Sequence, residues 1–180
     1  RGLVTSYTRN GFGEVRVQQS PDTGQTTYTY DTAGKVLTQV DARSVQTQYV
    51  YDALHRVTAI VYGSGHPQNV AYTYDETGSI AGCSGARNGI GRLTSVTDES
   101  GSTQYAYDGR GNVTCKAVTI TGNDWGQSTV WRTHYAYDGA DRLTEMTYPS
   151  GTVVRYLRNS AGRVSEVTAA PDGVTHQTVV

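Results

Sequence analysis

A short pattern of tyrosine, aspartate and glycine recurs along the chain, and each copy alternates apolar with polar positions. In the clearest copy, residues 28–36, Tyr28 and Tyr30 lie two apart and are followed by Asp31 and Gly34. Residues two apart share a face of a β-strand, so both rings project from the same side. The pattern predicts a strand with an aromatic face and a hydroxyl-rich face.

The residues after each tyrosine pair predict a tight turn. The Asp31 carboxylate can accept a backbone N–H two residues on, and Gly34 can adopt the positive φ that lets the chain reverse. Residues 36–40 then predict a return strand. A looser turn follows, as at residues 20–24 and 148–151, so each copy predicts two strands and two turns.

Seven copies can be aligned by their first tyrosines, which are separated by 21, 21, 23, 33, 30 and 21 residues. A period in the low twenties is typical of repeat proteins, whose units bury surface only by stacking. We predict an all-β fold of roughly 14 or 15 strands, a repeat array of antiparallel β-hairpins in one continuous, twisted and curling sheet. We expect residues 1–180 to be a single array and a fragment of a larger protein. The marker tyrosines are Tyr7, Tyr28, Tyr49, Tyr72, Tyr105, Tyr135 and Tyr156.

The repeated turn positions are the candidate site residues, and we predict a structural role for them. Two copies carry His55 or Asp141 where glycine is usual, and His tolerates a left-handed backbone better than most residues. We expect no catalytic role for His55. The predicted turn residues are Tyr30, Asp31, Gly34, Tyr51, Asp52, Tyr74, Asp75, Gly78, Tyr107, Asp108, Gly111, Tyr137, Asp138, Asn159 and Gly162.

Aliphatic residues of the return strands lie three apart, as in Leu143 and Met146. A regular strand would place them on opposite faces. Either both faces are partly buried or a β-bulge intervenes, and the pattern fits both.

The fourth copy contains extra residues, 79–90, that can form a short added strand and a glycine-rich loop before the return strand resumes at residues 91–96. Residues 85–91 lack the Lys-Ser/Thr of a phosphate loop, which favours a mobile surface loop. Cys83 and Cys115 form no C-x-x-C motif, so we expect no metal site. They can form a disulfide if they face each other, but two small buried thiols are the favoured interpretation.

Trp125 and Trp131 lie in the long return segment of the fifth copy and are the candidate ligand contacts. Exposed tryptophan beside Asn and Asp can form a sugar-stacking surface. The favoured alternative is a longer hairpin in which both rings pack on the neighbouring sheet.

Composition and charge narrow the function. The chain has 36% hydrophobic residues and 14 Tyr but 1 Phe, which suits half-buried strands. A formal charge of -1 without a basic cluster disfavours nucleic-acid and membrane partners. Calcium needs more oxygen ligands than one carboxylate per turn supplies, so we expect no cofactor or metal.

The many carboxylates do not indicate an enzyme. Each lies at an equivalent turn, whereas a catalytic pair is expected once, in unlike surroundings. We therefore expect no enzymatic activity.

The repeated Tyr-Asp pair, with its turn glycine and trailing Arg/Lys-Leu/Val, resembles the Rhs or YD-repeat family along nearly the whole chain. The segments 88–93 and 148–151 are similar to those of bacterial Rhs proteins. The pairs are Tyr30-Asp31, Tyr51-Asp52, Tyr74-Asp75, Tyr107-Asp108 and Tyr137-Asp138.

The resemblance implies a segment of a hollow β-shell that encloses a C-terminal toxin or other cargo polypeptide, in a secreted or cell-surface bacterial protein. The implied partners are further repeats of the parent chain and the enclosed cargo. The family's autoproteolytic motif contains Asp-Pro, which is absent here, so self-cleavage is assigned to no residue. The alternative function is a cell-surface adhesion or carbohydrate-binding module, which would add carbohydrate as a partner.

Overall fold

The structure, a computed structural model, describes residues 3–63, 69–122, 128–175 and 177–178. These residues form fifteen β-strands. No helix among them is long and apolar enough to cross a bilayer. The strands are β1 Ser6–Arg9, β2 Val15–Ser20, β3 Gly24–Tyr30, β4 Val36–Val40, β5 Gln46–Tyr51, β6 Val57–Tyr62, β7 Val70–Tyr74, β8 Leu93–Asp98, β9 Gly101–Tyr107, β10 Val113–Ile120, β11 Thr129–Tyr137, β12 Leu143–Thr147, β13 Val153–Arg158, β14 Val164–Ala170 and β15 Gln177–Thr178.

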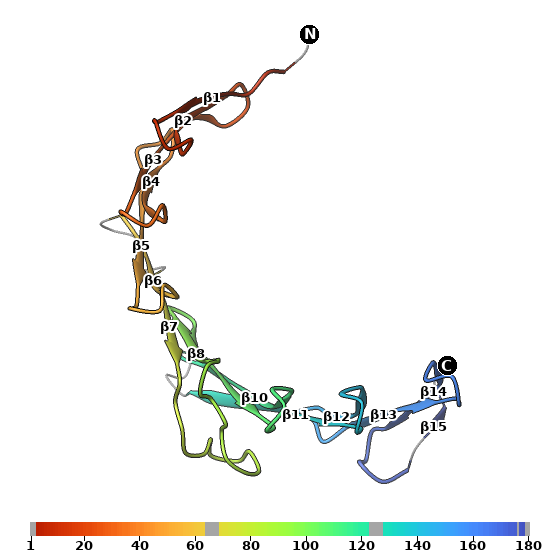
Figure 1. The fold of residues 1–180 in the computed structure, drawn as a ribbon. Coiled ribbons are helices and arrows are strands. Elements are labelled where there is room, and N and C mark those ends of the chain that lie inside the picture. The colour runs from red at the N-terminus through yellow and green to blue at the C-terminus, as the bar shows by residue number, and fades with distance from the viewer. Residues whose placement is uncertain (1–2, 64–68, 123–127, 176, 179–180) are drawn as a thin grey trace. The chain divides into compact units, whose positions relative to one another are not determined.

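Each strand neighbours the strands before and after it in sequence, in one open sheet ordered from β1 to β15 (Figure 1). The paired neighbours run antiparallel, as in β3 with β4 and β9 with β10. Every odd-numbered strand from β1 to β13 carries the first tyrosine of one copy, and the following even-numbered strand is its return strand. The predicted all-β array of antiparallel hairpins is confirmed.

A β-bulge at the start of the return strands explains the three-residue spacing of their aliphatic positions. In β11 and β12, Tyr137 pairs with Leu143 and Tyr135 with Met146, and the register shifts between them. Tyr135 and Tyr137 share a face, so the bulge brings Leu143 and Met146 onto that face as well. Shifts at the same place in β3–β4, β5–β6 and β13–β14 make the bulge a repeated feature.

The chain divides into two compact units, Arg1–Tyr72 and Thr73–Val180. The first contains β1 to β6, and its described residues are half-buried or exposed, apart from the buried Ser20 and Thr26. The second contains a small core in which Ala106, Cys115 and Ala117 are 1–2% exposed. Most of the array is therefore stabilised by strand pairing and turns, with side-chain burial concentrated in one place.

Residues 75–92, which include the insertion of the fourth copy, join β7 to β8 (Figure 1). Ile80 and Cys83 of this segment pack with that core. The segment contains no strand, and its residues Ile80, Arg87 and Gly89 are buried. The expectation of an added strand is wrong. Residues 85–91 form a surface loop, as expected, in which only Arg87 and Gly89 are buried, and its mobility stays a prediction. Apolar contact and a buried guanidinium hold the segment on the sheet, and neither was visible in its glycine-rich sequence.

Cys83 of the insertion and Cys115 of β10 form a disulfide, with their Cα atoms 5.9 Å apart. The favoured interpretation of two buried thiols is therefore wrong. The two cysteines are 32 residues apart, and only the folding of the insertion onto β10 brings them together.

The fifth copy forms the predicted longer hairpin, because β10 and β11 pair from Cys115 with His134 to Ile120 with Thr129. Trp131 lies on β11 opposite Val118 and is 48% exposed. Trp125 lies outside the described residues. The expected packing of the ring on the neighbouring sheet is therefore only partial for Trp131.

Gly101, the first residue of β9, has no space for a side chain. Its φ is +143°, and a Cβ atom there would overlap the Thr119 carbonyl of β10. We expect Gly101→Ala to lower the free energy of unfolding by at least about 2 kcal/mol, measured by urea denaturation. The matched control is Gly109→Ala, because a Cβ at Gly109 meets nothing within 4 Å. Equal stability of the two variants would contradict the close backbone approach.

Candidate functional site

The turn after each tyrosine pair is the feature that the structure repeats most faithfully. In the second copy, the Asp31 N–H donates to the Lys35 carbonyl at 2.8 Å, and the Gly34 N–H donates to the Asp31 carbonyl at 3.1 Å. The Asp31 carboxylate accepts the N–H groups of Ala33 and Lys35 at 2.9 and 2.8 Å. One side chain thus binds the backbone across the whole turn.

The same carboxylate or amide contacts recur in the other copies. Asp52 and Asp138 each accept two backbone N–H groups through Oδ1, and Asp108 accepts three. In the first and seventh copies, Asn10 and Asn159 accept the equivalent bonds through their amide oxygens. An asparagine amide oxygen can therefore accept the same backbone N–H groups as the aspartate carboxylate.

The fourth residue of each turn has a left-handed backbone. Gly34, Gly111 and Gly162 have φ values of +78°, +100° and +76°. His55 and Asp141 occupy the same position with φ of +64° and +59°. The left-handed conformation is disfavoured for residues with a Cβ, so each of these two requires a compensating contact.

The fourth copy keeps the turn despite its insertion. The Asp75 N–H donates to the Arg92 carbonyl at 3.2 Å, and the Asp75 carboxylate accepts the Gly91 N–H at 2.6 Å. Gly91, with φ of +76°, occupies the left-handed position that the sequence assigned to Gly78. Gly78 instead lies inside the insertion, where its carbonyl accepts the Arg87 N–H at 2.7 Å.

The second carboxylate oxygen binds the side chain that follows the turn. Lys35 contacts Asp31 at 2.9 Å, and Arg142 contacts Asp138 at 2.7 Å. The pKa of Asp31 is lowered, chiefly by the Lys35 side-chain hydrogen bond, and that of Asp138 chiefly by the Arg142 backbone N–H. A carboxylate held ionised with its oxygens occupied is poorly suited to accept a proton in catalysis.

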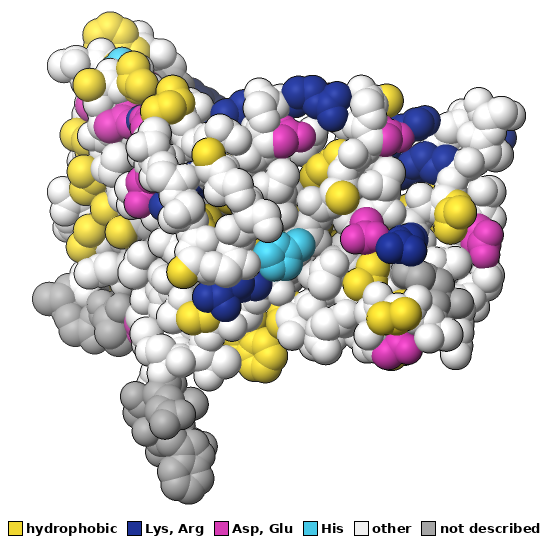
Figure 2. Space-filling view, turned by 90° about the horizontal axis from the view of Figure 1, so that it is seen from below, with side chains coloured by type: hydrophobic (Ala, Val, Ile, Leu, Met, Phe, Trp, Pro, Cys, Tyr) yellow, Lys and Arg dark blue, Asp and Glu magenta, His cyan; other side chains and the backbone are white. Residues whose placement is uncertain are grey.

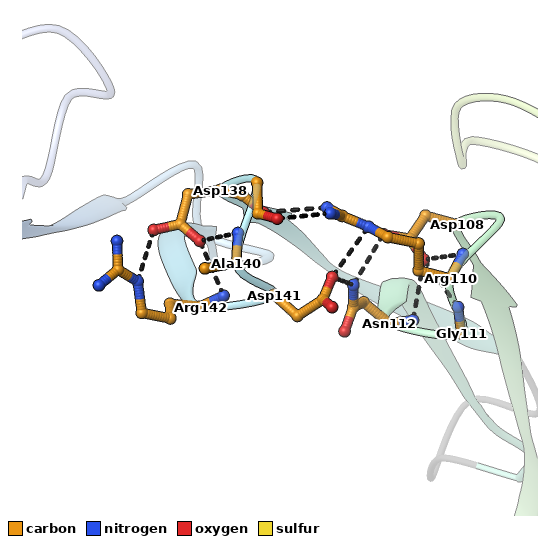
Figure 3. Close-up of polar contacts among 9 residues, drawn as sticks. Asp108, Arg110, Gly111, Asn112, Asp138, Ala140, Asp141 and Arg142 are labelled. Atoms are coloured by element: carbon orange, nitrogen blue, oxygen red, sulfur yellow. Dashed lines mark hydrogen bonds and ion pairs between the residues drawn. The ribbon is translucent and has the colours of Figure 1, made fainter. Parts of the chain in front are cut away.

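Side chains also join successive turns, as Figure 3 shows for the fifth and sixth copies. The Arg110 guanidinium donates to the Asp138 and Gly139 carbonyls at 2.9 Å and forms an ion pair with Asp141 at 2.9 Å. The Asn112 amide donates to Asp141 at 2.7 Å (Figure 3). The departure from glycine at position 141 thus supplies a carboxylate that binds the preceding turn.

His55 has an equivalent partner in the preceding turn, because the Lys35 Nζ lies 2.5 Å from its Nδ1. Where glycine is kept, the preceding turn's side chain lies over it. Arg92 approaches Gly111, and Arg142 approaches Gly162. The left-handed position is therefore a contact point between neighbouring copies.

The second tyrosine of a copy binds the backbone of the copy before it. The Tyr30 hydroxyl donates to the Val15 carbonyl at 2.7 Å, and the Tyr51 hydroxyl to Val36 at 2.9 Å. Tyr107 makes the same bond to Leu93. In the seventh copy, Arg158 stands at this position and donates to the Leu143 carbonyl at 2.9 Å.

The sequence predicted an aromatic strand face from these tyrosines and did not indicate the role of their hydroxyl groups. The replacement of tyrosine by Arg158 was the available signal, because Tyr and Arg share a polar donor at the end of a long side chain. Both residues therefore link successive copies through a hydrogen bond.

Arg87 is the buried charge of the insertion, with 5% of its surface exposed. Its guanidinium donates to the carbonyls of Thr94 and Tyr105 and pairs with Glu76 at 3.1 Å. Burial raises the pKa of Glu76, but hydrogen bonds from Ser95 and Thr94 outweigh it, and the net pKa is lowered. Sequence reasoning did not single out Arg87, whose burial depends on the path of the insertion.

The remaining surface is mixed in charge and also carries exposed apolar side chains, among them Phe12, Leu54 and Ile90. On the face shown in Figure 2, acidic and basic side chains lie interspersed among uncharged ones. Within the described ranges, no group of three His, Cys, Asp or Glu side chains could hold a metal ion. A hollow of about 560 Å³ is lined by Asn88, Asp108 and His134, among others, but the Asp108 oxygens are occupied by its own turn.

Three comparisons place this geometry among known proteins. The RHS repeat family matches residues 30–67, 87–123, 127–153 and 137–175. No curated protein matches the sequence at a significant level. The TcdB2-TccC3 structure is similar with a TM-score of 0.79 and 17% identity over 97% of this chain. The Photorhabdus luminescens Tc holotoxin pore is similar with a TM-score of 0.78, 17% identity and the same coverage.

The chain spans 9% of the length of each of these two structures. The fold and its linked turns define a repeat protein built from antiparallel β-hairpins. The family match covers more than half of the sequence, and the chain belongs to the RHS repeat family.

Removing the Asp138 carboxylate should destabilise the sixth turn. We expect Asp138→Ala to lower the urea midpoint more than Asp138→Asn does, because asparagine keeps the amide oxygen that serves in the turns of Asn10 and Asn159. Equal loss in both variants would show that the Arg142 ion pair, and not the backbone bonds, holds the turn.

Low pH should destabilise all of the aspartate turns. Hydrogen bonds in the turns hold the folded-state pKa values of Asp31, Asp52, Asp108 and Asp138 below the ordinary aspartate value of 3.8. Their stabilisation is therefore complete above pH 3.8 and is lost as the pH falls through the folded-state values. We expect the urea midpoint to decrease as the pH is lowered from about 5 to about 2. A urea midpoint that stays constant over this pH range would contradict the stabilising role of these carboxylates.

The tyrosine hydroxyl should contribute measurably. We expect Tyr30→Phe to lower the free energy of unfolding by about 1 kcal/mol, because the Val15 carbonyl, in a partly buried hydrogen bond, loses this donor. Tyr7→Phe is the matched control, since Tyr7 is 53% exposed and lies in the first strand. If the Tyr30→Phe variant is as stable as the control, the Tyr30 hydroxyl does not help to hold successive copies together.

Proposed function

We propose that this chain is a structural wall segment of an exported Rhs-type β-shell that encloses a C-terminal toxin or other cargo polypeptide. The observation that carries the proposal is the repeated link between copies. Turn side chains and tyrosine hydroxyls join successive hairpins, as in the second and sixth copies, in a sheet that continues strand by strand. Such a sheet supplies an extended barrier instead of a single site.

The similar structures support this role at the level of the fold. One is described as TcdB2-TccC3 and the other as a Tc holotoxin pore, and both match 97% of this chain. Because the chain spans only 9% of the length of each similar structure, we propose that residues 1–180 form one repeat array within a longer protein. Its partners are further repeats of that protein and the enclosed polypeptide.

We propose that the segment has no catalytic role of its own and that its turn residues are structural. The turn carboxylates bind backbone N–H groups and neighbouring cations, which leaves them no free oxygen for a substrate. The exposed half of Trp131 is the one described feature that fits a carbohydrate contact. The comparisons give that alternative no support.

We propose that the protein works outside the cytoplasm. The Cys83–Cys115 disulfide supports this location, because such bonds persist mainly in oxidising compartments. A net charge of -1 also supports a partner other than nucleic acid or an anionic membrane.

The parent protein, expressed with its C-terminal region, tests the proposal. We expect cryo-electron microscopy to show a closed shell with internal density, and added protease to spare the C-terminal region. Ala117→Pro breaks the pairing of β10 with its neighbours and should expose that region to cleavage, because proline removes a ladder N–H.

Gly109→Ala is the matched control and should preserve protection. A C-terminal region that is cleaved equally in the wild-type and Ala117→Pro proteins would contradict enclosure. The carbohydrate-binding alternative would be favoured if microscopy shows no shell and if the protein binds a glycan that the Trp131→Ala variant does not bind.

A further inference from the structure

The disulfide joins the sheet to a part of the insertion that has few other attachments. We propose that the Cys83–Cys115 bond makes residues 79–86 a redox-controlled cover over the face of β9 and β10. In the oxidised protein the cover is closed, and reduction by a dithiol opens it. The proposal concerns this segment alone and stands whether or not the chain is part of a shell.

The covered surface is particular to this copy. Ala106 of β9 and Cys115 and Ala117 of β10 lie on the face opposite the tyrosines, and each is 1–2% exposed beneath the insertion. The residues that correspond to Ala106 in two other copies, Val50 and Leu157, are 39% and 45% exposed. The small core thus depends on the cover, because the sheet alone leaves this face open.

The insertion has two parts that differ in how they are held. Residues 87–92 are held on β9 by backbone bonding, since the Arg87 carbonyl accepts the Tyr107 N–H at 2.9 Å and the Arg87 N–H donates to the Gly78 carbonyl. The Arg87 guanidinium also donates to two strand carbonyls. The Asn88 amide adds a bond of 2.8 Å to the Tyr107 carbonyl. This part is anchored without the disulfide.

Residues 79–86 have fewer noncovalent attachments. Ile80 is 6% exposed and packs in the core, and Arg132 donates to the Ala81 carbonyl at 2.7 Å. The Cys83 N–H donates to the Ile80 carbonyl within the same turn, which adds no link to the sheet. The Cys83 sulfur is therefore the principal tether of the cover.

The reduction step is a balanced thiol–disulfide exchange. A thiolate of the dithiol attacks the Sγ of Cys83, the more exposed of the two cysteines, and the Cys115 thiolate leaves. The second thiol of the reductant then attacks the mixed disulfide, forms a cyclic disulfide and releases the Cys83 thiolate. Two electrons pass to the protein, and both thiolates take up protons as their pH-dependent ionisation requires.

Alkylation of the reduced protein reports whether the cover opens. Once dithiothreitol has cleaved the bond, a closed cover would leave Cys115 buried and only Cys83 reactive. We expect iodoacetamide to modify both cysteines at rates within about tenfold of each other, because opening exposes Cys115. Cys115 modification slower by a hundredfold or more would overturn the proposal.

Hydrogen exchange followed by mass spectrometry provides the second readout. We expect peptides from residues 79–86 to exchange at least tenfold faster after reduction, while peptides from β12 and β13 remain unchanged. Faster exchange throughout the protein would also overturn the proposal, because the disulfide would then hold the whole unit and not a local cover.

Two variants separate the covalent from the noncovalent tether. The double variant Cys83→Ser with Cys115→Ala should exchange rapidly in this segment with or without reductant. Arg132→Gln removes the bond to Ala81 and should leave the oxidised segment protected. Rapid exchange in oxidised Arg132→Gln, or protection in the double variant, would show that the disulfide is not the controlling link.

Discussion

The rest of this structure depends on the binding of backbone N–H groups by one turn side chain in each copy. Asp31 and its equivalents fix the reversal after every tyrosine pair, and the hairpin geometry follows from that reversal. Because few side chains are fully buried, strand pairing and turns must supply much of the order that a globular domain obtains from its core. The same groups have lowered pKa values, so the charge that stabilises the turn is present through the neutral range.

The copies are joined by contacts that use the points where the sequence departs from its own pattern. His55 and Asp141 replace glycine in a left-handed conformation, and each binds a side chain of the preceding turn. Arg158 replaces tyrosine and donates to the same backbone position as the tyrosine hydroxyl. These substitutions preserve a contact between neighbouring copies, so the repeat continues through them.

Much of the fold could be predicted because its periodicities are local. Tyrosines two apart define a strand face, and the Asp and Gly that follow define the turn, so the alternation of strands was visible along the chain. The insertion could not be predicted in the same way. Its Arg87 and Ile80 are buried by strands that are distant in sequence, and its glycines gave no sign of that packing. The disulfide was missed for the same reason, since a sequence contains no measure of the distance between Cys83 and Cys115.

The sequence by itself determined the repeated hairpin, its approximate copy number and its membership in the RHS repeat family. Each of these depends on residues within one short copy, where spacing alone determines which side chains share a face. Only the tertiary structure decided that a bulge places Leu143 and Met146 on the tyrosine face, that tyrosine hydroxyls link successive copies, and that the insertion is fastened over β9 and β10. Those features depend on the register of neighbouring strands and on the path of an irregular segment. Both are set by the sum of many contacts between copies.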